Sequence, residues 1–221
     1  MNVIDAIRGR ASVRAYLDKP VSNEVITQIL EAARWAPSGV NTQPWFVHVV
    51  KGSLKQQIGD EIIAAKEAGQ EPNQDYKYYP DTFPEPYLTR RRACGQALYG
   101  ALGIDKRDIE RRKEQWHKNY HGFGAPVELF VFIESKLEKG SWVDMGMFIQ
   151  NIILAARGFG LETCPQAAMA EYPDIVRRIL GVPETLSLMC GIALGYADYD
   201  DPVNSYRTER EPVETFTTWH A

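Results

Sequence analysis

The N-terminal stretch RGRASVRAY places three arginines and a serine within nine residues. Arg10, Ser12 and Arg14 alternate along the chain, so an extended backbone carries all three side chains on one side. Two guanidinium groups and a hydroxyl on one side can clamp a phosphate, because arginine presents its N–H donors in a rigid fork. Taken alone, a solvated charged surface is the simpler interpretation of this stretch.

A second basic pair, Arg207 and Arg210, lies near the C-terminus in YRTERE. A phosphate needs several donors that converge from different segments, so the two groups predict one anion site only if the fold brings the chain ends together. The formal net charge of −4 argues against nucleic acid as the main partner, and it leaves room for a small basic pocket.

A polar turn separates two well-formed elements in RWAPSGVNTQPW. Ser38, Asn41 and Gln43 offer hydroxyl and amide groups to a planar, hydrogen-bonding ligand, and Gly39 permits close approach of its backbone. The alternative is a turn that stops a helix and exposes polar side chains to water. The composition of the stretch does not decide between the two.

Several familiar site patterns are absent from the sequence. It contains neither the G-x-G-x-x-G fingerprint of dinucleotide-binding folds nor the G-x-x-x-x-G-K-[ST] phosphate loop. The four histidines lack the spacing and the accompanying carboxylates of a metal site, so no metal is predicted. The three cysteines are odd in number and lack C-x-x-C spacing, which fits the reducing cytoplasm. No window approaches the ~18 apolar residues of a membrane helix, so no membrane partner is predicted.

Predicted helices and strands must position these residues. Ser22 is a good N-cap for a helix over residues 22–33, and Pro37 biases the chain away from helical angles just beyond it. The apolar run WFVHVV predicts a buried strand over residues 45–50, and Ser53 is the expected cap of the next helix. The later elements expected are helices over 87–104, 105–121 and 143–157, strands over 126–134 and 186–196, and a helix bracketed by Pro173 and Gly181.

Residues 69–86 contain four prolines and no periodicity, which predicts a long loop of the kind that forms a lid or is mobile. Aromatic residues crowd this loop and its end: Tyr76, Tyr78, Tyr79, Phe83 and Tyr87. They fit either a lid over a flat ligand or side chains pinned onto the core. Because no linker or internal repeat divides the chain, the sequence predicts one α+β domain with a sheet covered by helices.

The sequence resembles the FMN-dependent nitroreductases. The resemblance rests on R-x-S-x-R at residues 10–14, A-P-S-G-x-N-x-Q-P-W at 36–45, GAPVELFVFIE at 124–134, the segment 142–184, and YRTEREPVE at 206–214. It implies a nitroreductase-like fold with a central mixed or antiparallel sheet flanked by helices, in a single domain over residues 1–221. Residues 69–123 would form a variable lid region and residues 198–221 a C-terminal arm. The resemblance also implies an intertwined homodimer in which each FMN lies at the subunit interface.

The resemblance further implies which residues hold the cofactor. Arg10 and Arg210 would bind the FMN phosphate, with Arg207 a weaker match, and Arg14 would lie near the N1–O2 edge of the ring. A strand-like segment from Pro165 would place a backbone N–H beside flavin N5; some relatives carry Glu-Gly in place of Ala-Ala there, so no side-chain role is implied. The full set is Arg10, Ala11, Ser12, Arg14, Pro37, Ser38, Gly39, Asn41, Pro165, Gln166, Ala167, Ala168, Arg207 and Arg210, with residues 37–41 reaching in from the second subunit.

The implied activity is NAD(P)H-dependent reduction of nitroaromatic or quinone-type acceptors by a ping-pong mechanism. The flavin carries the chemistry, NAD(P)H is a transient co-substrate, and no catalytic side chain is required. Arg90, Arg91 or Arg92 could meet the carboxylate of a small aromatic acid. The alternatives are enone reduction or dehalogenation on the same scaffold, a flavin-sequestering or flavin-sensing protein without turnover, and a plain interaction domain.

Overall fold

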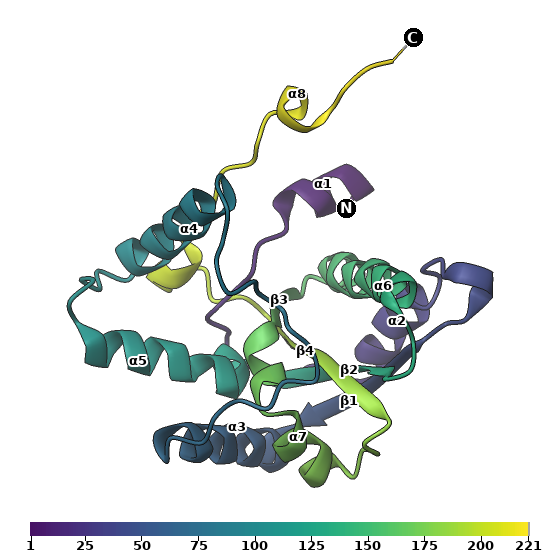
Figure 1. The fold of residues 1–221 in the computed structure, drawn as a ribbon, viewed down its shortest axis with the longest axis horizontal. Coiled ribbons are helices and arrows are strands. Elements are labelled where there is room, and N and C mark those ends of the chain that lie inside the picture. Colours follow the sequence, from purple (N-terminus) through teal and green to yellow (C-terminus); the bar gives the residue numbers. More distant parts are fainter. Residues whose placement is uncertain (221) are drawn as a thin grey trace.

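The fold is shown in Figure 1 as a computed structural model, which describes residues 1–220. Helices outnumber strands along the described chain. In chain order the elements are α1 (Val3–Gly9), α2 (Asn23–Ala33), β1 (Trp45–Lys51), α3 (Gly52–Glu67), α4 (Tyr87–Ala101), α5 (Ile109–His117), β2 (Val127–Glu134), α6 (Lys139–Gly158), β3 (Glu162–Gln166), α7 (Pro173–Leu180), β4 (Leu186–Gly195) and α8 (Val213–Phe216).

The four strands form one sheet in the order β1-β2-β4-β3, and every neighbouring pair is antiparallel. The predicted α+β class with a helix-flanked sheet is confirmed. Strand periodicity predicts three strands, and the structure adds β3 at one edge. This strand has only five residues and includes Pro165, so its local signal is too weak to find it.

Helices cover both faces of the sheet, with α2 and α6 on one face and α3 and α7 on the other (Figure 1). Alternate residues of β2 divide between the two layers: Leu129 and Val131 pack with α2 and α6, and Phe130 and Phe132 pack with α3 and α7. Because β2 is buried on both faces, it forms a continuous apolar run rather than an alternating pattern.

Several element boundaries follow the predicted signals, and others do not. The Ser22 hydroxyl accepts a hydrogen bond from the Val25 amide at 3.3 Å, so the predicted cap of α2 is confirmed. The predicted Ser53 cap is wrong, because α3 begins at Gly52, and Lys51, which precedes it, makes no side-chain capping bond. Helix α6 starts at Lys139, four residues earlier than predicted.

The predicted helix over 105–121 is also shorter than expected. Its helical part is α5, and the chain then continues in 3-10 turns over Lys118–Gly124, whose last three residues all have positive φ angles. The predicted loop over 69–86 has no helix or strand. One of its aromatic residues is pinned to the core, because the Tyr76 hydroxyl donates to the Met189 carbonyl at 2.5 Å, whereas Tyr78 and Tyr79 are exposed.

Candidate functional site

Residues 10–14 run in an extended conformation along the outer edge of β3. Ser12 forms an isolated parallel bridge with Thr163, and the Val13 amide donates to the Thr163 carbonyl at 3.1 Å. Val13 is 2% exposed, whereas Ser12 and Arg14 on either side are half-buried, and the whole segment from Arg10 to Arg14 lines a cavity. The extended backbone expected from the R-x-S-x-R spacing is therefore present.

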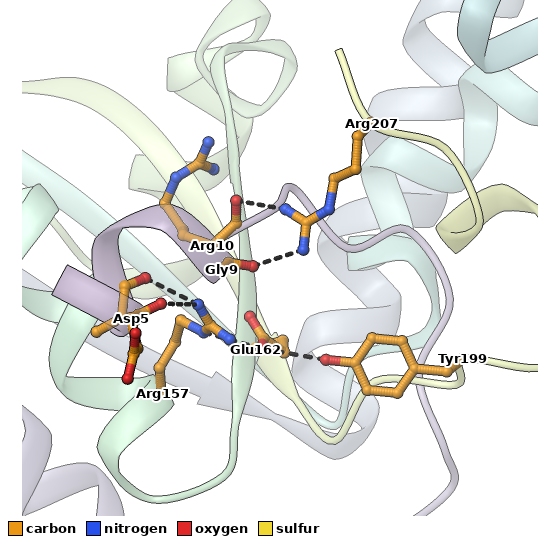
Figure 2. Close-up of polar contacts among 8 residues, drawn as sticks. Asp5, Gly9, Arg10, Arg157, Glu162, Tyr199 and Arg207 are labelled. Carbon is orange, nitrogen blue, oxygen red and sulfur yellow. Dashed lines mark hydrogen bonds and ion pairs between the residues drawn. The ribbon is translucent and has the colours of Figure 1, made fainter. Parts of the chain in front are cut away.

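The C-terminal arm supplies the opposite wall of this cavity, so the two ends of the chain meet. Arg207 donates from Nη1 to the Arg10 carbonyl at 2.7 Å and from Nη2 to the Gly9 carbonyl at 2.6 Å (Figure 2). Arg14 Nη1 donates to the Tyr206 hydroxyl at 2.9 Å. The cavity has a volume of about 720 Å³, and Arg210, Cys94 and Gln150 also line it.

Positive charge dominates the cavity. Arg10 has no hydrogen bond or ion pair from its guanidinium to any other residue of the described chain, and Figure 2 shows it pointing away from Arg157 and Glu162. Burial, followed by the charges of Arg210 and Arg207, lowers the pKa of Arg10. Glu162 also lines the cavity, but Arg157 already pairs with it, with Nε 3.0 Å from Oε1. The arrangement can bind an anion that supplies several acceptor oxygens.

A second arginine fixes α1 beside the cavity. Arg157 of α6 donates from Nη1 to the Ala6 carbonyl at 2.8 Å and to the Asp5 carbonyl at 3.3 Å, while its Nε holds Glu162 (Figure 2). A Cβ at Gly9 would lie 2.3 Å from Arg157 Nη1. Glycine at this position lets the Arg157 guanidinium pack directly against the end of α1, and that end carries Arg10.

Sequence reasoning missed the residues that hold these segments in place. The Asn204 side chain accepts from the Arg14 amide at 2.8 Å and donates to the Ala15 carbonyl at 2.9 Å. The Tyr199 hydroxyl donates to Glu162 Oε1 at 3.1 Å. Each bond joins residues far apart in the chain, so no local pattern could have indicated them. The nearest signal is the position of Tyr199 and Asn204 close to the arginines of the arm.

The predicted residues at the end of β3 do not line the cavity. Pro165 is exposed, whereas Gln166 is buried and donates to the Asn119 carbonyl at 2.6 Å. Ala167 and Ala168 begin a 3-10 turn that runs to Glu171. The segment continues the same strand that carries Thr163, the bridge partner of Ser12, so it lies along the same sheet edge.

The predicted turn residues Pro37, Ser38, Gly39 and Asn41 are also absent from the cavity of their own chain. They lie between α2 and β1, and Gly39 bonds to Asp144 at the start of α6. Within residues 1–220 no group of three His, Cys, Asp or Glu side chains could hold a metal ion. No helix in that range is both long and apolar enough to cross a membrane.

Comparison with known proteins agrees with this architecture. A model of the nitroreductase family matches residues 7–196. The 4-nitrobenzoate reductase of Pseudomonas putida is 39% identical over 212 residues, covering 96% of this chain and 92% of that protein. The nitrobenzene nitroreductase of Ectopseudomonas oleovorans is 37% identical over 216 residues, covering 97% of this chain and 95% of that protein.

Solved structures give the same result over the whole chain. The FMN and NADPH-dependent nitroreductase NfnB from Sphigopyxis sp. strain HMH superimposes with a TM-score of 0.97 at 37% identity, covering 100% of both chains. NfnB from Mycobacterium smegmatis, solved in complex with NADPH, gives a TM-score of 0.94 at 32% identity and covers 99% of this chain and 97% of its own. From the match over residues 7–196 and these full-length similarities, the chain belongs to the nitroreductase family.

Proposed function

We propose that this protein is an FMN-dependent NAD(P)H oxidoreductase that reduces nitroaromatic or quinone-type acceptors. The observation that carries the proposal is the convergence of Arg10, Arg207 and Arg210 on one cavity, where the Arg10 guanidinium has no partner within residues 1–220. A phosphate monoester has the charge and the acceptor oxygens that this cluster lacks. Two relatives are named for nitroaromatic substrates and NfnB for FMN and NADPH, which supports this assignment.

The residues around the cavity fit FMN on chemical grounds. Arg10 would bind the phosphate together with Arg210, whose exposed guanidinium is bonded only within its own segment, to Thr208 and Glu209. Arg207 would add charge while its bonds to Gly9 and Arg10 hold the phosphate-binding segment in place. When bound, FMN supplies the two-electron exchange between NAD(P)H and the acceptor. The side chains then bind and orient the reactants, and none is required as a catalytic acid or base.

We further propose that the protein works as a homodimer. Helix α1 exposes Val3, Ile4 and Ile7, and the arm exposes Val213, Phe216 and Trp219. A second copy of the chain would cover these apolar side chains. The turn over 37–41 would then reach a cofactor held mainly by the other chain. The three free cysteines fit the cytoplasm as the location.

A visible spectrum of the purified protein, followed by anaerobic titration, tests the proposed function. We expect bound FMN to give a yellow protein, NADH or NADPH to bleach it rapidly, and a nitroaromatic acceptor to restore the colour. Restoration by an enone or a halogenated phenol, but not by nitroarenes, would instead indicate the other redox steps. A yellow protein that neither nicotinamide bleaches would be a flavin-sequestering or flavin-sensing protein. A colourless protein that takes up no added FMN would contradict the proposal altogether.

A further inference from the structure

The turn between α2 and β1 has an unusual backbone. Val40, Asn41 and Gln43 all adopt left-handed angles, with φ values of 46°, 58° and 49°. This region is uncommon for residues other than glycine and unfavourable for a β-branched residue such as valine. Val40 is 98% exposed, so packing within the chain does not impose its conformation. Such strain persists only where surrounding bonds fix the backbone, and it is concentrated at functional segments.

Hydrogen bonds within the turn account for part of this rigidity. The Gln43 amide donates to the Ser38 hydroxyl at 3.0 Å, the Thr42 hydroxyl donates to the Gly39 carbonyl at 2.8 Å, and the Asn41 amide donates to the Ser38 carbonyl at 2.9 Å. These bonds fix the shape of the turn but do not attach it to the rest of the protein. The Asn41 side chain makes no hydrogen bond within the described chain and remains available to a ligand.

One bond ties the top of the turn to a helix. The Gly39 amide donates to Asp144 Oδ2 at 3.1 Å, and Asp144 is only 9% exposed on α6. Asp144 makes no ion pair with a cationic side chain of residues 1–220, and its carboxylate accepts from the Gly39 amide instead. A hydrogen bond to a buried charged acceptor is stronger than one between neutral groups. This bond therefore connects the turn directly to α6.

Gly39 has no need to be glycine within its own chain. Its φ lies outside the left-handed region, and an added Cβ would come no nearer than 3.8 Å to its closest neighbour, Asp144 Oδ2. The neighbouring residues that do adopt left-handed angles are not glycine. Within one chain the Gly39 backbone is therefore open to approach from outside.

We propose that Asp144 is a positioning residue, which holds the Ser38–Gln43 turn so that Gly39 and Asn41 face the flavin bound by a second copy of this chain. The proposal rests on the proposed function, because it requires both FMN and the dimer. It adds a role for Asp144, which would not contact the cofactor itself but would act through the Gly39 amide. A flat ring can approach the Gly39 backbone closely, because glycine has no side chain. The polar edge of the ring can then exchange hydrogen bonds with the Asn41 carboxamide.

Two variants of Asp144 test the proposal in the full-length protein. Asp144→Ala removes the acceptor, whereas Asp144→Asn keeps an oxygen that the Gly39 amide can use. For Asp144→Ala we expect hydrogen exchange at the Gly39 amide, without added FMN, to be about ten-fold faster and the FMN dissociation constant to rise about ten-fold. In Asp144→Asn we expect both the exchange rate at the Gly39 amide and the FMN dissociation constant to return most of the way to the wild-type values. Thr27→Ala is the control, because it also removes one side-chain hydrogen bond, from the Thr27 hydroxyl to the Asn23 carbonyl at 2.9 Å near the start of α2, away from the turn.

The outcomes separate this inference from the proposed function. Unchanged exchange in Asp144→Ala, or faster exchange with unchanged FMN affinity, would overturn the role of Asp144. If the wild-type protein binds no FMN, the proposed function fails, while the exchange measurement still decides whether Asp144 holds the turn. Should Asp144→Ala not fold, Gly39→Ala replaces it: we expect an unchanged melting temperature with weakened FMN binding, and unchanged FMN binding would reject the proposal.

Discussion

Arginine has five N–H donors, and the arginines around this cavity use them in different ways. Arg157 uses its donors in bonds to Glu162 and to carbonyls of α1, so its role is to hold the structure together. Arg207 supports two backbone carbonyls, and Arg14 is oriented by Tyr206. Arg10 keeps its guanidinium free within the described residues. At the scale of single residues, the residue type alone therefore does not assign a role to an arginine. Its hydrogen bonds within the protein determine which of its N–H donors remain for a ligand.

Replacing Arg10 with alanine tests its assignment as a phosphate ligand. We expect Arg10→Ala to weaken FMN binding by about 10- to 100-fold, because a charge-assisted bond to a desolvated phosphate contributes ~1.5–3 kcal/mol. Fluorescence titration with FMN measures the effect. Arg34→Ala, which removes an exposed arginine paired only with Glu31, is the control. Unchanged FMN retention in Arg10→Ala would contradict the assignment.

Glu128 is a buried carboxyl group away from the cavity, enclosed by two glycines. A Cβ at Gly122 or Gly191 would lie 2.3 or 2.4 Å from its oxygens, and neither oxygen has a hydrogen-bond partner among residues 1–220. Burial raises the pKa of Glu128 well above its usual range, and the opposing effect of Lys55 is smaller. The group is therefore neutral in the folded protein at pH values where it ionises in the unfolded chain.

This difference makes stability depend on pH in a defined direction. The folded pKa of Glu128 exceeds the unfolded value of about 4.3, so its contribution is complete below that pH and is lost as the pH rises toward the folded pKa. We expect Glu128→Gln to remove a slope of up to about 1.4 kcal/mol per pH unit in this window. Urea unfolding from pH 4 to 8 measures it, with Glu184→Gln in an exposed turn as the control. Parallel curves for wild type and Glu128→Gln would refute this prediction.

At the scale of elements, the site depends on a helix that could not exist alone. Helix α1 has seven residues, fewer than an isolated helix needs in water. Arg207 donates to the Gly9 carbonyl at the C-terminal end of the helix, where carbonyls lack partners within the helix. Arg157 adds a second donor to the Ala6 carbonyl, which also accepts from the Arg10 amide at 3.2 Å. Two arginines from distant parts of the chain thus hold the helix that ends beside Arg10.

A methyl group at Gly9 should disturb this attachment. Arg157 is held by several bonds and cannot move freely, so we expect Gly9→Ala to lower the melting temperature and to weaken FMN binding together. Gly158→Ala is the matched control, since its Cβ would meet nothing within 4 Å, and it should stabilise α6 by ~0.5–1 kcal/mol. Thermal unfolding of both variants measures the difference. A Gly9→Ala protein as stable as wild type would show that Arg157 adapts.

Helix α4 bears the arginines expected to select acidic substrates. Arg90 pairs with Glu211 of the arm, with Nε 2.8 Å from Oε1, and Arg91 lies over the Phe83 ring at 4.7 Å. Arg90 is one turn before Cys94, which lines the cavity, so it is placed near the cavity mouth.

We expect Arg90→Gln to raise the KM for 4-nitrobenzoate about two- to five-fold, in the range of an exposed ion pair, with little change for nitrobenzene. Steady-state kinetics with both acceptors measure the effect. Arg107→Gln serves as the control, because it removes one positive charge outside α4. Equal effects on the two acceptors would remove Arg90 from substrate selection.

At the scale of the whole molecule, the C-terminal arm is the least supported part of one chain. It carries α8 away from the sheet toward the C-terminus (Figure 1). Trp219 is 88% exposed, and Val213 and Phe216 are also exposed. An arm of this composition needs a surface to bind, and a second copy provides one if the chains exchange arms.

Shortening the arm tests this interpretation. We expect a chain that ends at Glu211 to dissociate into monomers at concentrations where the full chain is dimeric, with the dimer dissociation constant raised at least about 30-fold, because buried aromatic anchors contribute ~2 kcal/mol or more each. Analytical ultracentrifugation over a dilution series measures the dimer dissociation constant. Glu184→Gln, a substitution outside the arm, is the control and should leave this constant unchanged. A shortened chain that remains dimeric at the lowest concentration would exclude the arm from the interface.

The sequence by itself determined the features that depend on neighbouring residues. The Ser22 cap, the helix stop before Pro37, the apolar runs of β1, β2 and β4, and the Pro173 and Gly181 ends of α7 all follow from periodicity and local backbone chemistry. The R-x-S-x-R and A-P-S-G-x-N patterns sufficed to indicate the family, which the comparisons confirm.

The tertiary structure alone decided how those residues become a site. It brings Arg207 onto the carbonyls of Gly9 and Arg10, places Glu162 and Arg157 beneath them, and ties Gly39 to Asp144. The bonds of Arg207 and of Gly39 join residues 105 to 198 positions apart, and each depends on a backbone carbonyl or amide whose direction is set by the fold. Backbone groups are the same in every residue, so their pairing leaves no mark on the sequence and is fixed only when the sheet and its helices assemble.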